Sequence, residues 1–318
     1  MGIHLPLPAG EDLFCDLPNG MRLCYRSHGP LSGQPLLLVV GLGLQLIYWS
    51  PQLIHELVNR GFRVIVFDNR DVGRSSRANM APPSPWRLML RQPDPRNYDL
   101  GDMAQDALGL LDHLGILRAH LVGMSMGGMI AQTLAARHPR RVASLTSIFS
   151  TTGSRRVGQP ALSTMLKLMK APPSGKAQAI ARFIAMSQHI GPSTYEFDER
   201  DLQAYATRAW DRGHGETAHE GIGRQIAAIM KSGDRTPEVR QIKAPTLVIH
   251  GERDPMVHPS GGLATADAVP GAHYLTVRGM GHAIPEGVIP YLSDLIDGHA
   301  KRSLGWHPRA LHGQVQAV

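Results

Sequence analysis

One serine stands in a setting that makes a hydroxyl reactive. Residues 123–128 read Gly-Met-Ser-Met-Gly-Gly, which places Ser125 between an apolar segment, 119–122, and an amphipathic segment, 126–137. A G-x-S-x-G motif between a strand and a helix is typical of a nucleophile elbow, a strained turn that lifts the serine hydroxyl clear of a sheet. Glycine suits the positions two before and two after the serine, because the backbone there comes too close for side chains. A structural or phosphate-binding turn is the alternative, but the glycine spacings of dinucleotide and P-loop motifs are absent. We therefore predict that Ser125 is a nucleophile.

A serine hydroxyl attacks only when a base takes its proton, and the base needs an acid that fixes its tautomer. After an elbow of this kind the partners are expected in the order Ser, Asp, His, on loops that follow later strands. Asp254 follows the apolar segment 246–250, and His282 ends the Gly-Met-Gly-His sequence that follows segment 273–277. We predict that His282 is the general base and that Asp254 is the acid that orients it.

The sequence around Asp254 allows other interpretations of the acid. Glu252 lies two residues before Asp254 and stays open as a rival acid, and the Asp254-Pro255 pair also suits a simple turn. The chain has 16 histidines, so most of them have no part in chemistry. His250, at the end of an apolar segment, is interpreted as structural.

The negative charge that develops on the substrate oxygen needs two N–H donors. The backbone N–H of Met126 directly follows the nucleophile at the start of a helix, where the helix dipole also favours negative charge. The second donor is expected in the loop after the apolar run 36–40, and the backbone N–H of Leu42 is our candidate.

These residues require a sheet whose strands end at one edge. Apolar strand patterns alternate with helix patterns along the chain, as in a mostly parallel, twisted sheet covered by helices on both faces. A hairpin with an Asn19-Gly20 turn is predicted near the start of the chain. Strands are expected at 14–17, 21–25, 36–40, 63–68, 119–122, 142–149, 246–250 and 273–277, and helices from 51 to about 60, from 102 to 115, at 126–137, around 262 and at 288–299.

The alternation of strands and helices stops between residues 150 and 240. Helix patterns broken by prolines and glycines fill this stretch, at 162–170, 175–187, 198–210 and 221–231. We predict one sheet domain formed by 1–149 and 241–300, with an inserted helical cap at 150–240. Residues 301–318 are basic, lack apolar periodicity and are expected to form a flexible tail.

The motifs resemble those of the α/β-hydrolase superfamily over nearly the whole chain. Residues 68–75 match its D-x-R-x-x-G-x-S loop, which is a structural turn. The stretches VVGLG, FDNRDVGRSS, GMSMGGMIAQ and GMGHAIP further resemble aclacinomycin-methylesterase-type carboxylesterases. The resemblance implies the α/β-hydrolase fold and ester hydrolysis, and it leaves the substrate open. One departure is Val40, which stands where much of the superfamily has histidine, so support for the first oxyanion loop must come from elsewhere.

The substrate pocket is the least defined part of the pattern. Leu44, Trp49 and Met124 are our candidates for substrate binding, as walls of an apolar acyl site. The Met- and Leu-rich segment 165–170 suits either that site or the core of the insert. Arg155 and Arg156 suit either an acidic substrate or an ordinary basic surface.

Composition narrows the class of protein. The chain has 318 residues and a formal charge of +7, but its arginines are scattered and form no basic run of the kind that binds nucleic acid. The N-terminus lacks a signal-peptide pattern, and the apolar runs are too short to span a bilayer, so we expect a cytoplasmic protein without stable membrane association. Homo-oligomerisation stays open. The two cysteines of the chain, Cys15 and Cys24, are expected to face each other in the hairpin as free thiols.

Taken with the resemblance, these patterns predict a serine hydrolase. It is expected to cleave carboxylic esters of small, largely apolar molecules through an acyl-enzyme, without metal or organic cofactor. Two alternatives stay open. In the first, the same triad hydrolyses lactones, thioesters or carbon–carbon bonds or carries out cofactor-free perhydrolysis. In the second, the protein is a homologue that binds small molecules without turnover.

Overall fold

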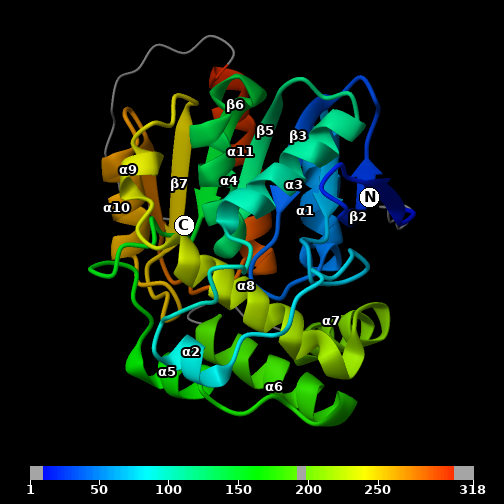
Figure 1. The fold of residues 1–318 in the computed structure, drawn as a ribbon. Coiled ribbons are helices and arrows are strands. Elements are labelled where there is room, and N and C mark those ends of the chain that lie inside the picture. Colours follow the sequence, from blue (N-terminus) through cyan, green and yellow to red (C-terminus); the bar gives the residue numbers. More distant parts are fainter. Residues whose placement is uncertain (1–9, 192–197, 304–318) are drawn as a thin grey trace.

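A computed structural model describes residues 10–191 and 198–303 (Figure 1). Its centre is an eight-stranded sheet in the order β1-β2-β4-β3-β5-β6-β7-β8, antiparallel at β1/β2 and β2/β4 and parallel elsewhere. The strands are β1 Leu13–Asp16, β2 Arg22–His28, β3 Gln34–Val39, β4 Phe62–Phe67, β5 Ala119–Met124, β6 Val142–Ile148, β7 Thr246–Gly251 and β8 His273–Val277. The predicted mostly parallel sheet is confirmed.

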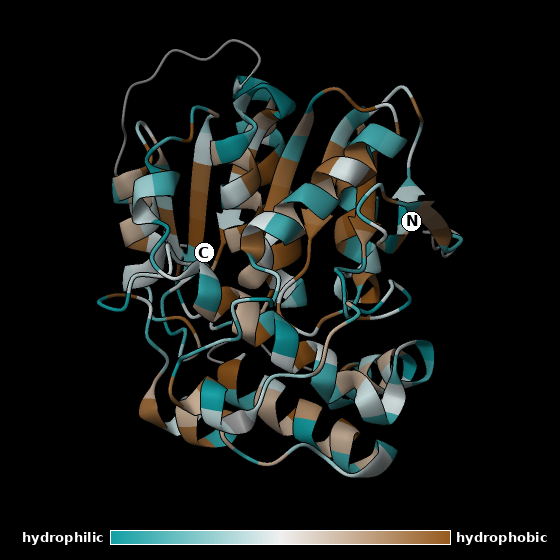
Figure 2. Ribbon diagram, viewed as in Figure 1, coloured by the Kyte–Doolittle hydropathy of each residue, from teal (hydrophilic) through white to brown (hydrophobic). Residues whose placement is uncertain are grey.

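Helices cover both faces of the sheet because alternate strand residues point to opposite sides. In β3, Leu37 and Val39 join the core cluster beneath α3 (Leu100–His113) and α4 (Met126–Arg137). Leu36 and Leu38 join the cluster beneath α1 (Pro51–Asn59) and α11 (Ile289–Arg302). Figure 2 shows the resulting apolar strands between two helical layers. The core helices are α1 Pro51–Asn59, α3 Leu100–His113, α4 Met126–Arg137, the short α9 Thr236–Val239, α10 Ser260–Ala268 and α11 Ile289–Arg302.

Two helix starts show how local sequence sets these bounds. Ser50 begins α1 by accepting a hydrogen bond from the backbone N–H of Gln52, with Pro51 at the first helical position. Asp99 and Asp102 form a capping box, so α3 begins at Leu100, slightly before the predicted start at 102. At the other end of the chain, α11 continues through Lys301 to Arg302, so these two residues are helical and the predicted tail began too early. Residues 304–318 of that tail lie outside the described residues.

The predicted hairpin register was wrong by one residue. The Leu17 N–H donates to the carbonyl of Met21, so the loop has three residues and Cys15 lies opposite Leu23. Gly20, the third loop residue, has a φ of 81°, a conformation that glycine adopts without strain. A one-residue shift moves side chains to the other face of a sheet. Cys15 and Cys24 therefore lie in opposite core clusters, and both are free thiols.

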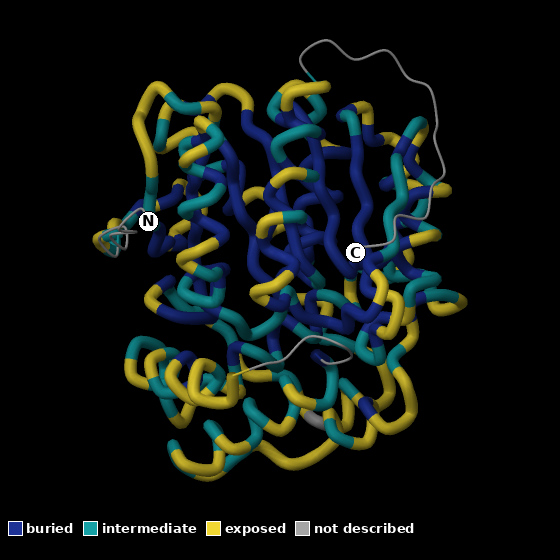
Figure 3. Tube along the Cα trace, turned by 180° about the vertical axis from the view of Figure 1, so that it is seen from behind, coloured by how far each residue is buried: buried dark blue, intermediate teal, exposed yellow. Residues whose placement is uncertain are grey.

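Four of the helices between β6 and β7 gather at one end of the molecule, below the carboxyl ends of the strands (Figure 1). They are α5 Leu162–Leu168, α6 Gly175–Ile190, α7 Glu199–Arg212 and α8 Ala218–Ser232. A fifth helix at this end, α2 Pro85–Met89, was not predicted from the sequence. Burial is concentrated in the sheet and thins out through these helices (Figure 3), and α6 has no buried residue. The predicted cap limits, 150 and 240, stay a prediction.

An arginine on α7 fastens this helical layer to the core. The Arg212 guanidinium donates to Asp68 at 2.6 Å, to Asp12 at 3.2 Å and to the side chain of Gln45 at 3.0 Å. Asp12 also pairs with Arg26, so one carboxylate binds side chains from the N-terminal hairpin and from α7. Burial raises the pKa of Asp12, but hydrogen bonds from Arg74, Arg26 and Arg212 outweigh it and lower the pKa to about 2.

We expect Asp12→Asn to lower the free energy of unfolding by about 1 kcal/mol at pH 7, after allowance for solvent screening. The pKa of Asp12 in the folded chain lies below its ordinary value of 3.8, so the unfolded chain binds more protons at acid pH. The stabilisation is therefore full above pH 4 and is lost as the pH falls toward 2. Urea unfolding of both proteins at several pH values measures the difference. Asp16→Asn is the matched control, because the Asp16 side chain is 84% exposed. A difference that persists below pH 2 would contradict this account.

Candidate active site

Ser125 lies at the tip of a sharp turn between β5 and α4. Its φ of 54° and ψ of −122° place a non-glycine residue in a region that is normally reserved for glycine. A side chain at Gly123 would come within 2.3 Å of the Gly127 carbonyl, and one at Gly127 within 2.1 Å of the Val39 carbonyl. Both flanking glycines are thus required by close backbone approach, as the motif predicted.

The structure brings the three predicted residues into one hydrogen-bonded chain. The Nε2 atom of His282 lies 2.9 Å from Ser125 Oγ, and its Nδ1 atom lies 2.7 Å from Asp254 Oδ2. These lengths are those of good hydrogen bonds. Ser125 follows β5, Asp254 follows β7 and His282 follows β8, so three strand ends at the same edge of the sheet position the group. The His282 side chain is 8% exposed.

Asp254 is held rigidly by its own loop. Its Oδ1 atom accepts hydrogen bonds from the backbone N–H groups of Met256 at 2.8 Å and Val257 at 2.9 Å, which leaves Oδ2 directed at His282. Burial raises the pKa of the Asp254 carboxyl, but the charges and hydrogen bonds of His282 and His250 outweigh burial and lower the pKa to about 2. A carboxylate with this pKa is ionised at neutral pH. The rival acid Glu252 is exposed, and its carboxylate accepts from the Gly279 N–H at 3.4 Å.

His250 touches the acid, a contact that sequence reasoning missed. Its side chain is fully buried, and its Nε2 atom lies 2.8 Å from the Val257 carbonyl and 3.3 Å from Asp254 Oδ2. Both neighbours are acceptors, so Nε2 carries a proton. His250 therefore supports both the acid and the loop that holds it. The local sequence carries no signal of this contact, because a spacing of four residues pairs side chains on a helix and His250 lies in β7.

Phe149, the residue after β6, was also missed. Its ring centre lies 4.6 Å from that of His282, and its φ of 35° is a second strained backbone angle close to the site. The ring is buried and covers the imidazole, which limits the orientations open to His282.

The predicted oxyanion loop lies directly against the nucleophile. A side chain at Gly41 would come within 3.3 Å of Ser125 Cβ. Within the described part of the chain, no acceptor takes the N–H of the next residue, Leu42. Met126 is the first residue of α4, where helix N–H groups lack intrahelical partners. Leu42 and Met126 therefore stay the predicted oxyanion donors.

The residues named for the substrate pocket lie in different environments. Trp49 and Met124 are buried in the core cluster beneath α1 and α11, and Leu44 is half-buried against the same cluster. The apolar side chains of α5 are neither core nor enclosed. Those more than 40% exposed are Leu162, Met165, Leu166, Leu168 and, just after the helix, Met169. Arg155 and Arg156 are exposed. The pocket assignments stay predictions.

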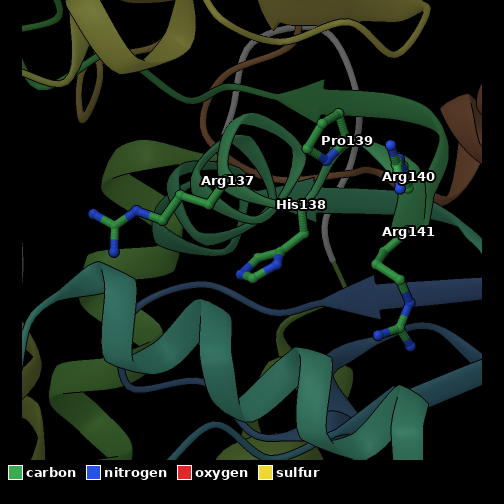
Figure 4. Close-up of a pocket in the computed structure, with 5 residues that line it drawn as sticks. All are labelled: Arg137, His138, Pro139, Arg140 and Arg141. Carbon is green, nitrogen blue, oxygen red and sulfur yellow. The ribbon is translucent and has the colours of Figure 1, made fainter.

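A hollow of about 250 Å³ elsewhere on the molecule is lined by Arg137, His138, Pro139, Arg140 and Arg141 (Figure 4). It lies at the carboxyl end of α4, about 18 Å along that helix from Ser125 at the amino end. Arg137 and Arg141 point away from each other, and each pairs with an acidic residue, Glu238 and Asp112 respectively. The two guanidinium groups do not converge on a common ligand.

Residues 10–191 and 198–303 contain no group of three or more His, Cys, Asp or Glu side chains placed to hold a metal ion. Over the same ranges, no helix combines the length and apolar character needed to cross a membrane.

Comparisons with known proteins agree with this geometry. The chain is 28% identical to rhodomycin D methylesterase DauP of Streptomyces sp. (strain C5) and to rhodomycin D methylesterase DnrP of Streptomyces peucetius, in each case over 86% of this chain and 93% of that protein. The enol-lactonase of Burkholderia xenovorans LB400 superposes with a TM-score of 0.67 at 27% identity, over 92% of this chain and all of that one. The family model described as alpha/beta hydrolase fold matches residues 34–286. The chain therefore belongs to the alpha/beta hydrolase fold family.

Proposed function

We propose that this protein is a serine hydrolase that cleaves carboxylic esters of small, largely apolar molecules. The observation that carries the proposal is the hydrogen-bonded chain from Ser125 Oγ through His282 to the Asp254 carboxylate, built on a strained turn. An esterase assignment also agrees with the names of the methylesterase relatives and of the enol-lactonase. The cytoplasmic location expected from the sequence stays a prediction.

In the proposed mechanism, Ser125 Oγ attacks the ester carbonyl carbon while His282 Nε2 takes the hydroxyl proton. The N–H groups of Leu42 and Met126 hold the oxyanion of the tetrahedral intermediate, and Asp254 stabilises the imidazolium. The intermediate collapses to an acyl-enzyme as His282 protonates the leaving alcohol. Water then attacks the acyl group by the same sequence, which releases the acid and restores Ser125.

Lactone hydrolysis is the second candidate. A lactone is a cyclic ester, so the same three residues open it, and the released alcohol stays attached to the acyl group. The similarity to the enol-lactonase, at 27% identity over its whole length, favours this candidate over thioester hydrolysis, carbon–carbon bond hydrolysis and perhydrolysis.

Phosphonate labelling combined with a substrate panel tests the proposal. We expect a fluorophosphonate to modify Ser125 stoichiometrically, and the Ser125→Ala protein to take up none. The panel contains p-nitrophenyl esters of increasing acyl length, lactones, thioesters and amides. Ester hydrolysis should survive EDTA, because the chemistry above needs no metal. Labelling of a different serine, or activity that EDTA removes and zinc restores, would overturn the proposal. Labelling at Ser125 without turnover of any panel member would instead indicate a binding protein.

A further inference from the structure

The oxyanion loop is held from outside its own segment. Val40, which precedes the loop, has no side-chain group that forms a hydrogen bond. Its carbonyl accepts instead from the side chain of Asn69, at 3.0 Å. At the other end of the loop, the Gly43 N–H donates to the side-chain oxygen of Gln225, at 2.9 Å. Gln225 belongs to α8, so part of the support comes from the helical layer that covers the site.

Gln225 is satisfied at both ends of its amide. Its Nε2 atom donates to the carbonyl of Arg70 at 2.8 Å, while its Oε1 atom accepts from Gly43. Each backbone partner has a fixed polarity, so the amide has only one orientation that pairs both. The side chain is completely buried, so losing either bond leaves a buried backbone group unpaired.

The bond to Gly43 bears directly on the Leu42 donor. Gly43 N–H and Leu42 C=O belong to one peptide unit, so Gln225 fixes the plane that follows Leu42. The Leu44 N–H donates to the Gly41 carbonyl at 3.3 Å and closes a four-residue turn, in which Gly43 has a φ of 68°. That carbonyl shares a trans peptide with the Leu42 N–H, so the N–H points the opposite way, out of the turn. The turn and Gln225 together set the direction of the donor.

The helical layer reaches the site at a second point. The backbone N–H of His282 donates to the carbonyl of Ile190, the last residue of α6, at 2.7 Å. A side chain at Gly281 would come within 2.3 Å of the same carbonyl. Helices α6 and α8 thus contact the two loops that carry the base and one oxyanion donor.

From these contacts we propose that Gln225 is a positioning residue for catalysis. It holds the Leu42 N–H in line with the oxyanion, so the docked position of α8 determines the rate of the chemical step. This inference rests on the proposed function, because it assigns a role within the same site. If Gln225 had only a structural role, its loss would lower the stability of the fold but would not selectively weaken binding of the transition state.

The test compares two Gln225 variants with a control on the same helix. Gln225→Met keeps the length of the side chain and loses both hydrogen bonds. Gln225→Glu keeps an acceptor for Gly43 and loses the donor to Arg70. Glu220→Gln is the control, because it breaks the ion pair between Glu220 of α8 and Arg77 and leaves the loop contact intact.

We expect Gln225→Met to lower kcat by about 10²-fold with KM within about threefold of wild type, the effect of one misplaced oxyanion donor. Gln225→Glu should lose less. The affinity for a trifluoromethyl ketone, which forms a tetrahedral oxyanion on Ser125, should fall by the same factor as kcat/KM. Glu220→Gln should keep wild-type values of both. If Gln225→Met fails to fold, Gln225→Glu carries the same comparison.

The outcomes separate this inference from the proposed function. Wild-type kcat and ketone affinity in the folded Gln225 variants, with Ser125→Ala inactive, would overturn the role of Gln225 alone. A rise in KM with unchanged kcat would also overturn it, because it would indicate a role in substrate access. Full activity in Ser125→Ala would overturn the proposed function and this inference with it.

Discussion

Replacement of Ser125 by alanine is expected to lower kcat for p-nitrophenyl esters by a factor on the order of 10⁶. The hydroxyl oxygen forms the bond to the acyl group, and it is made nucleophilic by His282, whose Nε2 atom lies 2.9 Å away and takes its proton. The proposed oxyanion donors, the backbone N–H groups of Leu42 and Met126, remain in the variant, so a small residual rate above that of water is expected. Initial rates at saturating ester, with active-site titration of the wild type, measure the loss.

His282→Ala should cost about as much as Ser125→Ala, and the double variant little more. The losses in kcat from the two substitutions are not expected to add, because removing either the nucleophile or the base leaves the other without its function. His258→Ala is the matched control, because His258 is an exposed histidine on the Asp254 loop that pairs with Ser260. It should keep its activity within about twofold. Additive losses in the double variant would mean that Ser125 and His282 act separately, against the proposed mechanism.

The parts of the fold that the sequence predicted best are those with local physical causes. The helix 126–137 has the bounds that its apolar face and the preceding strand indicated. Ser50 and Pro51 mark the start of α1 in the same way, through one capping bond and a missing N–H. The chain order of Ser125, Asp254 and His282 pointed to the residues that the structure brings together, because parallel strands end at one edge of the sheet.

The parts that were missed depend on contacts between distant residues. Gln225 lies 182 residues from Gly43 in the sequence, and nothing in the residues around it marks its hydrogen bond to the loop. The hairpin register depended on the length of the loop, which has one residue more than predicted. The side chain of Asn19 contacts Asp106 and the backbone N–H of Met21, and Gly20 makes the turn. The apolar residues of α5 did not show from sequence whether their side chains are buried, because exposure depends on what packs against a helix.

Replacement of Asp254 by asparagine is expected to lower kcat by about 10⁴-fold, less than loss of the nucleophile or the base. An asparagine oxygen can still accept from the backbone N–H groups of Met256 and Val257, so its amide nitrogen would face His282 Nδ1. That nitrogen donates a hydrogen bond and so favours the imidazole tautomer that carries its proton on Nε2. A protonated Nε2 faces Ser125 and has no lone pair with which to take the hydroxyl proton.

Glu252→Gln is the matched comparison, because it neutralises the rival acid two residues away on the same loop. We expect its kcat to stay within about threefold of wild type, since the Glu252 side chain is exposed and its hydrogen bond from the Gly279 N–H is long. Rates of both variants on one ester, with circular dichroism as the check of folding, give the comparison. A nearly silent Asp254→Asn beside a severe Glu252→Gln would transfer the role of the acid to Glu252. If only Asp254→Asn loses activity severely, Asp254 is the acid of the triad, in agreement with the 2.7 Å distance between its Oδ2 atom and His282 Nδ1.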